Sequence, residues 1–314
     1  MRNDVPADLA GASVLVTGGA GFIGSHLAER LAGNCRVTVL DDLSTGDPAA
    51  VPEGATLVRG DVRDPADVTE AVRGTDVVFH QAALPDVTET VRSPVESHRR
   101  NATGAVTVLD AARREDARVV FASSAAVYGQ PRSLPIDESD RKTPTSPYGI
   151  DKLAADQHAR AYADLYGLPT VSLRYFNVYG PGRTAASGSG VVNAFLERAR
   201  DGETLVVHGD GSQTRDFVHV SDVVDANLRA ATTDHVGLAY NVGTGDAVSV
   251  REVADRVTRT LGSGSDVVHG EPRDGDIQHS RASIDRARLK LGFDPTYDFA
   301  AGLETMVRVR DHPT

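Results

Sequence analysis

The chain has 314 residues, with 33 Lys and Arg against 44 Asp and Glu, and a formal net charge of −11 at pH 7. This acidic balance argues against duplex nucleic acid or an anionic membrane as a partner, because both attract a basic surface. No apolar run approaches the ~18–20 residues of a membrane-spanning helix. The single cysteine, Cys35, cannot form an intramolecular disulfide, and no Cys/His cluster has metal-ligand spacing. We therefore expect a cytoplasmic protein without a metal.

Short apolar strands alternate with helical stretches from Ser13 to about Arg174, at the spacing of repeated βαβ units. The predicted strands are Ser13–Thr17, Arg36–Leu40, Thr56–Gly60, Asp76–His80, Arg118–Ser123 and Thr170–Arg174. The clearest predicted helices, with apolar residues recurring every three or four positions, are Ile23–Leu31, Pro94–Arg114 and Pro147–Tyr166. This alternation predicts an α/β fold, a Rossmann-type doubly wound parallel sheet that binds ligands at the carboxyl ends of its strands.

After Arg174 the regular alternation gives way to turns rich in Gly, Asp and Arg, such as residues 208–212, mixed with short strands and helices. We expect residues 176–314 to form a smaller C-terminal α/β lobe that holds the substrate, beside a cofactor domain of residues 1–175. The boundary is soft because no linker separates the two parts, and some segments can cross back over it.

A glycine-rich turn connects the first predicted strand to the first predicted helix. Gly18, Gly21 and Gly24 let the backbone turn tightly and approach a pyrophosphate at the helix N-terminus. Asp41 ends the second strand about 20 residues later, where a carboxylate would accept hydrogen bonds from the adenosine ribose. A carboxylate at that place repels a ribose phosphate, so the pattern favours NAD over NADP.

Further acidic residues follow the second and third predicted strands. Asp42 is equally well explained as a second ribose ligand and as a turn residue. Asp61 and Val62 are predicted to flank the adenine, although Asp61 could instead cap the helix that follows.

Tyr148, Lys152 and Ser124 form the candidate catalytic set. Tyrosine has an ordinary pKa of ~10, but a nearby ammonium favours the phenolate and brings the phenol toward neutral pH. Tyr148 and Lys152 are four residues apart, so they share one face of a helix. The alternatives are an ordinary aromatic at a helix start for Tyr148 and a strand-end hydroxyl bonded to the backbone for Ser124. Together with the glycine turn, the set predicts a nicotinamide-dependent redox enzyme.

In these motifs the chain resembles the extended short-chain dehydrogenases/reductases, and within them the UDP-hexose 4-epimerases. The segments that carry the resemblance are Thr17–Gly24, His80–Ala83, Ser123–Gly129, Tyr148–Lys152 and Arg174–Pro181. The resemblance implies that Tyr148 is the base at the sugar hydroxyl, that Ser124 hydrogen-bonds the same oxygen, and that Lys152 holds the nicotinamide ribose. It also implies a homodimer, and cofactor contacts from five further residues, Phe22, Ile23, Ala82, Ala83 and Tyr175. Two other members of these motifs, Tyr128 and His80, are interpreted as packed side chains.

The residues after Ser124 decide between the reactions of this family. Sugar-nucleotide dehydratases, which resemble it, carry an Asp-Glu pair there, whereas this chain has Ala125 and Ala126, which can neither donate nor accept a proton. The prediction is therefore 4-epimerisation by oxidation at carbon 4 and return of the hydride. Another NDP-sugar epimerase such as one for uronic acids, an NDP-sugar reductase or dehydratase, and an NAD-sensing regulator remain as alternatives.

The resemblance places the UDP-sugar in the C-terminal lobe. It implies substrate contacts from five residues of this chain, Asn177, Asn193, Arg215, Arg273 and Asp276. Guanidinium groups suit phosphate oxygens, but solubilising arginines and an aspartate that caps a loop are the alternatives. The position that gates the sugar ring falls at Ser280, or one residue to either side. A small residue there leaves room for an N-acetyl group. Uridine is favoured only by its frequency in the family.

Overall fold

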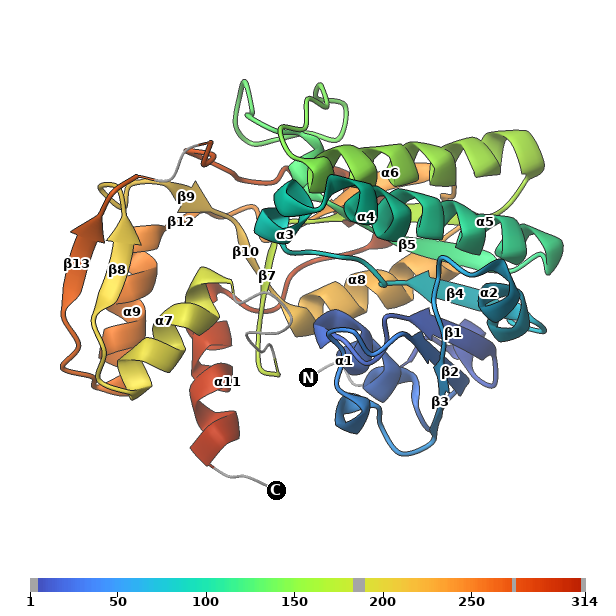
Figure 1. Ribbon diagram of the computed structural model, residues 1–314, viewed down its shortest axis with the longest axis horizontal. Helices are drawn as coiled ribbons and strands as arrows, with labels where there is room; N and C mark the ends of the chain where they lie inside the picture. The colour runs from blue at the N-terminus through green and yellow to red at the C-terminus, as the bar shows by residue number, and fades with distance from the viewer. Residues whose placement is uncertain (1–4, 183–189, 273–274, 312–314) are drawn as a thin grey trace.

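The computed structural model describes residues 5–182, 190–272 and 275–311. Its centre is a sheet of seven parallel strands in the order β11-β6-β5-β4-β1-β2-β3 (Figure 1). The strands in chain order are β1 (Ser13–Thr17), β2 (Arg36–Asp41), β3 (Ala55–Arg59), β4 (Val77–His80), β5 (Arg118–Ser124), β6 (Thr170–Tyr175) and β11 (Leu238–Val242). The strand order reverses between β1 and β4, which is where such sheets bind nucleotides.

Two layers of helices cover the sheet, and successive residues of a strand point into different cores. Val14 and Val16 of β1 pack into the core beneath one layer, while Leu15 between them packs into the core beneath the other. The first layer contains α1 (Phe22–Leu31) and α8 (Val220–Thr232), and the second contains α2 (Pro65–Val72), α5 (Gly104–Arg114) and α6 (Pro147–Tyr166). Strands buried on both faces explain the continuous apolar runs in the sequence. The Rossmann-type α/β prediction is confirmed.

The C-terminal half contributes to the sheet as well as to the lobe beside it. Strand β11 pairs with β6 at the edge of the sheet, and helix α8 packs against α1, β5 and β6. The lobe itself is built on β8 (Leu205–His208), β13 (Val267–Gly270), α7 (Val191–Arg200), α9 (Val250–Leu261) and α11 (Phe299–Asp311), which enclose their own apolar core. Two further short pairs form within the C-terminal half, β7 (Asn177–Tyr179) with β10 (Phe217–His219) and β9 (Thr214–Arg215) with β12 (Val248–Ser249).

The predicted long helix over Pro94–Arg114 is interrupted. It consists of α4 (Pro94–His98), a π-helical turn η3 (Arg99–Thr103) and α5. A π turn adds a residue to a helical turn and so changes which side chains face a neighbouring element. The short helix α3 (Val87–Arg92) precedes α4, and Arg100 of the π turn lines the cleft at the carboxyl ends of the strands.

Among the described residues, no helix is both long and apolar enough to span a bilayer.

Candidate active site

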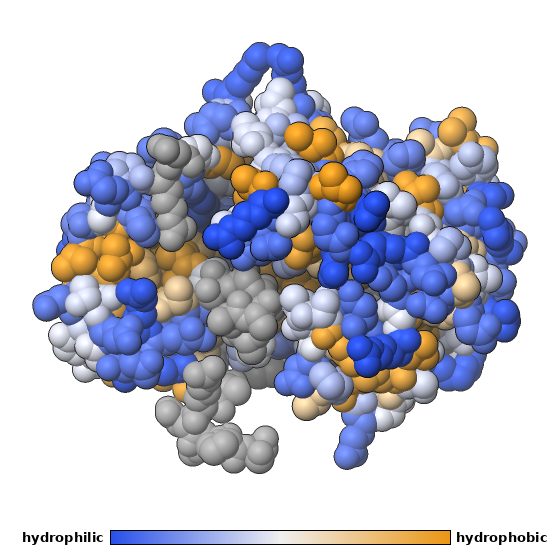
Figure 2. Space-filling model, viewed as in Figure 1, coloured by the Kyte–Doolittle hydropathy of each residue, from blue (hydrophilic) through white to orange (hydrophobic). Residues whose placement is uncertain are grey.

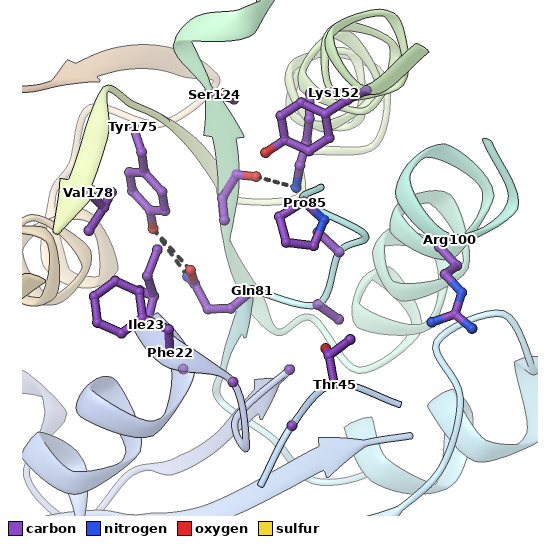
Figure 3. Close-up of a pocket in the computed structure, with 18 of the residues that line it drawn as sticks. Phe22, Ile23, Thr45, Gln81, Pro85, Arg100, Ser124, Lys152, Tyr175 and Val178 are labelled. Carbon is purple, nitrogen blue, oxygen red and sulfur yellow. Dashed lines mark hydrogen bonds between the residues drawn. The ribbon is translucent and has the colours of Figure 1, made fainter. Parts of the chain in front are cut away.

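A cleft of about 400 Å³ opens at the carboxyl ends of the strands, between the sheet and the lobe (Figure 3). All the predicted cofactor residues line it: Gly18, Gly21, Phe22, Ile23, Gly24, Asp41, Asp42, Asp61, Val62, Ala82, Ala83, Tyr148, Lys152 and Tyr175. Of the predicted substrate residues, Ser124, Tyr148, Asn177 and Asn193 line it, whereas Arg215 and Asp276 do not. Arg273 lies outside the described residues.

The glycine turn brings two backbone segments too close together for side chains. A Cβ on Gly18 would lie 2.6 Å from the backbone nitrogen of Ala82, and one on Gly24 would overlap the carbonyl of Gly18. Gly18 also has a φ of +68°, which favours glycine. The first turn of α1 therefore presents bare backbone N–H groups to the cleft, and these fit the pyrophosphate of NAD.

Asp41 ends β2 with a carboxylate that is fixed by the backbone. Its two oxygens accept hydrogen bonds from the N–H groups of Ala20 at 3.0 Å and Leu43 at 2.9 Å. Burial raises the pKa of this carboxyl, and the two backbone bonds oppose that shift. A carboxylate held in this way fits ribose hydroxyls and disfavours a ribose phosphate, as NAD requires.

Asp42 and Asp61 are each engaged by other side chains. Asp42 accepts from the N–H and hydroxyl of Ser44 at 2.9 and 2.6 Å, as in a turn, and also faces Arg100. Asp61 binds Arg63, whose guanidinium holds the pKa of that carboxyl below its usual range. The N-cap of α2 is Asp64, so the capping alternative for Asp61 is wrong.

Helix α6 carries the predicted Tyr148 and Lys152 and has clear end signals. Ser146 caps it by accepting from the N–H of Gly149, Pro147 occupies its first turn, and Gly167 ends it in the left-handed conformation. Tyr148 therefore lies in the first turn of the helix. The cap fixes where the helix begins, and with it which residues face the cleft.

Lys152 is buried beside the Tyr148 ring. Its Nζ donates to the carbonyl of Ala122 at 2.8 Å and lies 5.9 Å from the centroid of the Tyr148 ring. Burial lowers the pKa of Lys152 to about 7, and the nearby carboxylate of Asp151 opposes the shift. The chain thus places a buried amine next to the phenol of Tyr148.

Ser124 lies at the end of β5 and lines the same cleft. Its Oγ accepts from the N–H of Ala126 at 3.1 Å and so caps the short 3-10 turn over Ala125–Val127. The backbone-bonded alternative is therefore part of its role. Because the bond uses an oxygen lone pair, the hydroxyl keeps its proton for donation to a ligand.

A second tyrosine in the cleft, Tyr175, belongs to a ring of hydrogen bonds that the sequence did not indicate. Its hydroxyl lies 3.3 Å from Oε1 of Gln81 (Figure 3), Asn227 of α8 donates to the Tyr175 oxygen at 2.8 Å, and Gln81 donates to Oδ1 of Asn227 at 3.0 Å. Burial raises the pKa of Tyr175. Burial thus keeps this phenol protonated although the two side-chain hydrogen bonds oppose the shift, and the ring holds its wall of the cleft in place.

The two interpreted packing residues are buried. His80 accepts from or donates to the Thr17 hydroxyl at 2.7 Å, and burial lowers its pKa to about 3. Tyr128 donates to Asn241 at 2.6 Å and accepts from Arg174, which forms a buried ion pair with Asp156. These contacts tie the loop between Ser124 and Tyr148 to the sheet.

The residues predicted to contact the substrate are spread along the lobe side. Asn177 donates to the carbonyl of Asp216, and the N-terminus of α7, with Gly190 at its N-cap, lines the cleft next to Asn193. Arg215 and Asp276 form an ion pair with each other. These contacts leave the substrate roles of the four predicted side chains as expectations.

The predicted gate position does not face the cleft. The side chain of Ser280 is buried and its N–H donates to the carbonyl of Thr214, whereas His279 is exposed. No described residue of this loop lines the cleft.

Residues 14–243 match the profile of the NAD dependent epimerase/dehydratase family. The chain belongs to this family. The match spans the sheet with its cofactor residues and includes β11, the strand that joins the sheet from the C-terminal half. The predicted family and NAD as cofactor are confirmed.

Individual relatives of the NAD-dependent epimerase/dehydratase family are similar over almost their whole length. The chain is 39% identical to UDP-glucose 4-epimerase of Streptomyces lividans, with 90% of this chain and 91% of that protein covered. The structure of Thermus thermophilus UDP-glucose 4-epimerase in complex with NAD matches with a TM-score of 0.89 at 37% identity, covering 96% of this chain and 100% of that one. Such relatives confirm an isomerase of the extended short-chain dehydrogenase/reductase type.

A further relative has a different substrate in its name. The UDP-N-acetylglucosamine 4-epimerase of Methanobrevibacter ruminantium, solved with UDP-N-acetylmuramic acid, matches with a TM-score of 0.91 at 34% identity, covering 95% of this chain and 98% of that one. Overall likeness to epimerases therefore does not choose between plain and acetylated sugars.

Proposed function

We propose that the protein is an NAD-dependent UDP-hexose 4-epimerase that interconverts UDP-glucose and UDP-galactose. The observation that carries this proposal is the convergence of Tyr148, Lys152 and Ser124 on one cleft, followed by Ala125 and Ala126 in place of an acid-base pair. The relatives named as UDP-glucose 4-epimerases support the sugar.

In the proposed mechanism the chain moves one proton and positions the sugar. Tyr148 takes the proton of the 4-hydroxyl, Ser124 hydrogen-bonds the same oxygen, and the buried Lys152 favours the phenolate. When bound, NAD supplies the nicotinamide carbon that takes up the hydride from carbon 4 and returns it. Tyr148 gives the proton back once the keto-sugar has turned its other face. Neither Ala125 nor Ala126 can assist elimination of water, so the keto-sugar is reduced again.

The UDP moiety is proposed to bind along the lobe. The N–H groups that open α7, with Asn193, suit the diphosphate, and Asn177 suits the sugar. Arg215 and Arg273 would bind phosphate oxygens, and Asp276 the nucleoside ribose, after Arg215 and Asp276 exchange their mutual ion pair for the ligand. Acceptance of acetylated hexoses is proposed because no described residue of the loop around Ser280 lines the cleft, and because the M. ruminantium relative is named for an acetylated substrate.

The test is analysis of nucleotide sugars after incubation with UDP-glucose or UDP-N-acetylglucosamine separately, without added NAD. We expect the 4-epimer of UDP-glucose, and no product from Tyr148→Phe. Tyr166→Phe, on an exposed residue of the same helix, is the matched control and should retain activity. Loss of water, or turnover only with added NAD, would instead indicate a dehydratase or reductase, and conversion of UDP-glucuronate alone a uronic acid epimerase. Bound NAD with no sugar conversion would indicate a sensor.

The exposed face of α3, α4 and α6 supports a homodimer. Val91, Val95 and Ile150 are 60%, 66% and 54% exposed there, and Figure 2 shows apolar side chains at the surface where these helices lie. Apolar side chains gathered on one face favour burial in an interface. Ile150→Glu is expected to give monomers by sedimentation; a wild-type protein that already sediments as a monomer would contradict the dimer.

A cytoplasmic location is proposed from the single cysteine.

A further inference from the structure

Five charged side chains of alternating sign form a bridge across one end of the cleft. In spatial order they are Asp42, Arg100, Glu96, Arg63 and Asp61. Arg100 Nε donates to Glu96 at 2.7 Å and its Nη1 faces Asp42 at 3.3 Å, while Arg63 binds both Glu96 and Asp61. We call these five residues the ion-pair bridge. It joins the loop after β2 to the loop after β3 through the helix α4 and its π turn.

The ion-pair bridge lies where the adenosine of a dinucleotide would lie in this fold. Asp42, Arg100 and Asp61 line the cleft, whereas Glu96 and Arg63 do not. In Figure 3 Arg100 lies near Thr45, at the end of the cleft away from Lys152. Arg100 also donates to the Ser44 hydroxyl at 2.9 Å and so contacts the loop that begins with the ribose-binding Asp41.

The charges of the bridge are arranged to hold loops rather than to bind a phosphate. Each arginine is shared between two carboxylates, and with Asp41 the group carries four negative charges against two positive ones. Such a balance leaves no guanidinium free for a ribose phosphate. Both Arg99 and Arg100 belong to the π turn, but only Arg100 is partly buried and lines the cleft, whereas Arg99 is exposed to solvent.

We propose that Arg100 is a positioning residue for NAD, which closes the ion-pair bridge over the adenosine end of the cleft and slows release of the cofactor. An enzyme that regenerates its cofactor in each turnover benefits from slow release, and affinity changes of this kind act mainly on the dissociation rate. The proposal needs only NAD binding, so it can fail or hold independently of the sugar reaction.

The experiment measures the release of NAD from the holoenzyme, by chromatography of the freed nucleotide after dilution into excess ADP-ribose. Arg100→Ala is expected to release NAD about tenfold faster, since several charge-assisted contacts of a network are lost. Arg99→Ala, on the exposed neighbour, is the matched control and should release NAD at the wild-type rate. Arg100→Lys keeps the charge but not the fork and should fall between the two.

Two further arms separate this role from a general loss of structure. The Glu96 side chain does not line the cleft, yet Glu96→Gln should also speed release of NAD severalfold because it weakens the ion pairs of this residue with Arg63 and Arg100. Raising NaCl from about 0.05 M to about 1 M screens charges; it should speed release from the wild type severalfold and leave Arg100→Ala almost unchanged. Wild-type release rates in Arg100→Ala, or an equal effect of salt on both proteins, would overturn the proposal.

Discussion

The Nζ of Lys152 lies 5.9 Å from the centroid of the Tyr148 ring and donates to the carbonyl of Ala122. The lysine is thereby held under the tyrosine, with its pKa lowered to about 7 by burial. Folding therefore carries an unfavourable desolvation cost at this position. The same burial makes the local field of the ammonium strong, because low dielectric strengthens charge interactions.

Lys152→Met is expected to abolish activity and to raise the free energy of unfolding at pH 7 by about 1–3 kcal/mol. The unfolded lysine keeps its ordinary pKa of 10.5, so the folded state binds fewer protons between about 7 and 10.5 and loses stability at neutral pH relative to a neutral side chain. Urea denaturation of cofactor-free protein measures the change. A variant less stable than the wild type would contradict the desolvation argument.

Ser124→Ala is expected to lower turnover of UDP-glucose about 10- to 100-fold while the protein still retains NAD, because only the hydrogen bond to the reacting oxygen is lost. Ser124→Thr, which keeps the hydroxyl, should restore part of the rate. Steady-state kinetics and the content of bound NAD report the two effects separately. Unchanged turnover in Ser124→Ala would rule out a contact of this hydroxyl with the reacting oxygen.

Asn227→Leu is expected to destabilise the protein by about 2–3 kcal/mol, because the buried Tyr175 hydroxyl and the Gln81 amide each lose one hydrogen-bond partner. Tyr175→Phe should cost less, since it removes the buried hydroxyl itself. Thermal or urea denaturation of both variants measures the difference. Equal stability of Asn227→Leu and the wild type would mean that the ring of hydrogen bonds is not formed in solution.

Because His80 is buried, we expect the free energy of unfolding to fall in acid. Burial lowers its pKa to about 3 from 6.5, so below pH 6.5 the unfolded state binds the extra proton and the folded state does not. Stability contributed in this way is complete above pH 6.5 and is lost as pH falls toward 3, by up to about 1.4 kcal/mol per pH unit.

His80→Asn, whose side chain can still bond Thr17, should flatten this dependence between pH 6.5 and 5, as measured by urea denaturation. His158→Asn, on an exposed histidine of α6, is the matched control and should keep the wild-type slope. Identical slopes in His80→Asn and the wild type would show that another group governs acid stability.

The parts of the fold that follow from local sequence were predictable. The strands before Arg174 lie within one or two residues of their predicted bounds, because each is a short apolar run between turn residues. The glycine turn, Asp41 and the start of α6 were each predictable because the residues that mark each feature lie close together in the sequence. The cleft then collects every predicted cofactor residue, since parallel strands place their carboxyl ends together.

The features that were missed depend on contacts between distant segments. Asn227 lies in a helix of the C-terminal half, and nothing near it in the sequence indicates that it reaches Tyr175. The π turn at Arg99–Thr103 has no sequence signal of its own within an otherwise helical pattern. Arg100 looks like any surface arginine until that turn brings it to Asp42.

The measurement that tests the central claim most directly uses UDP-glucose carrying deuterium at carbon 4, with wild-type enzyme and no added NAD. Oxidation and return of the same hydride predict UDP-galactose that keeps the deuterium at carbon 4, and no product with Tyr148→Phe. Product that has lost the deuterium to solvent, or that has lost water, would contradict the account.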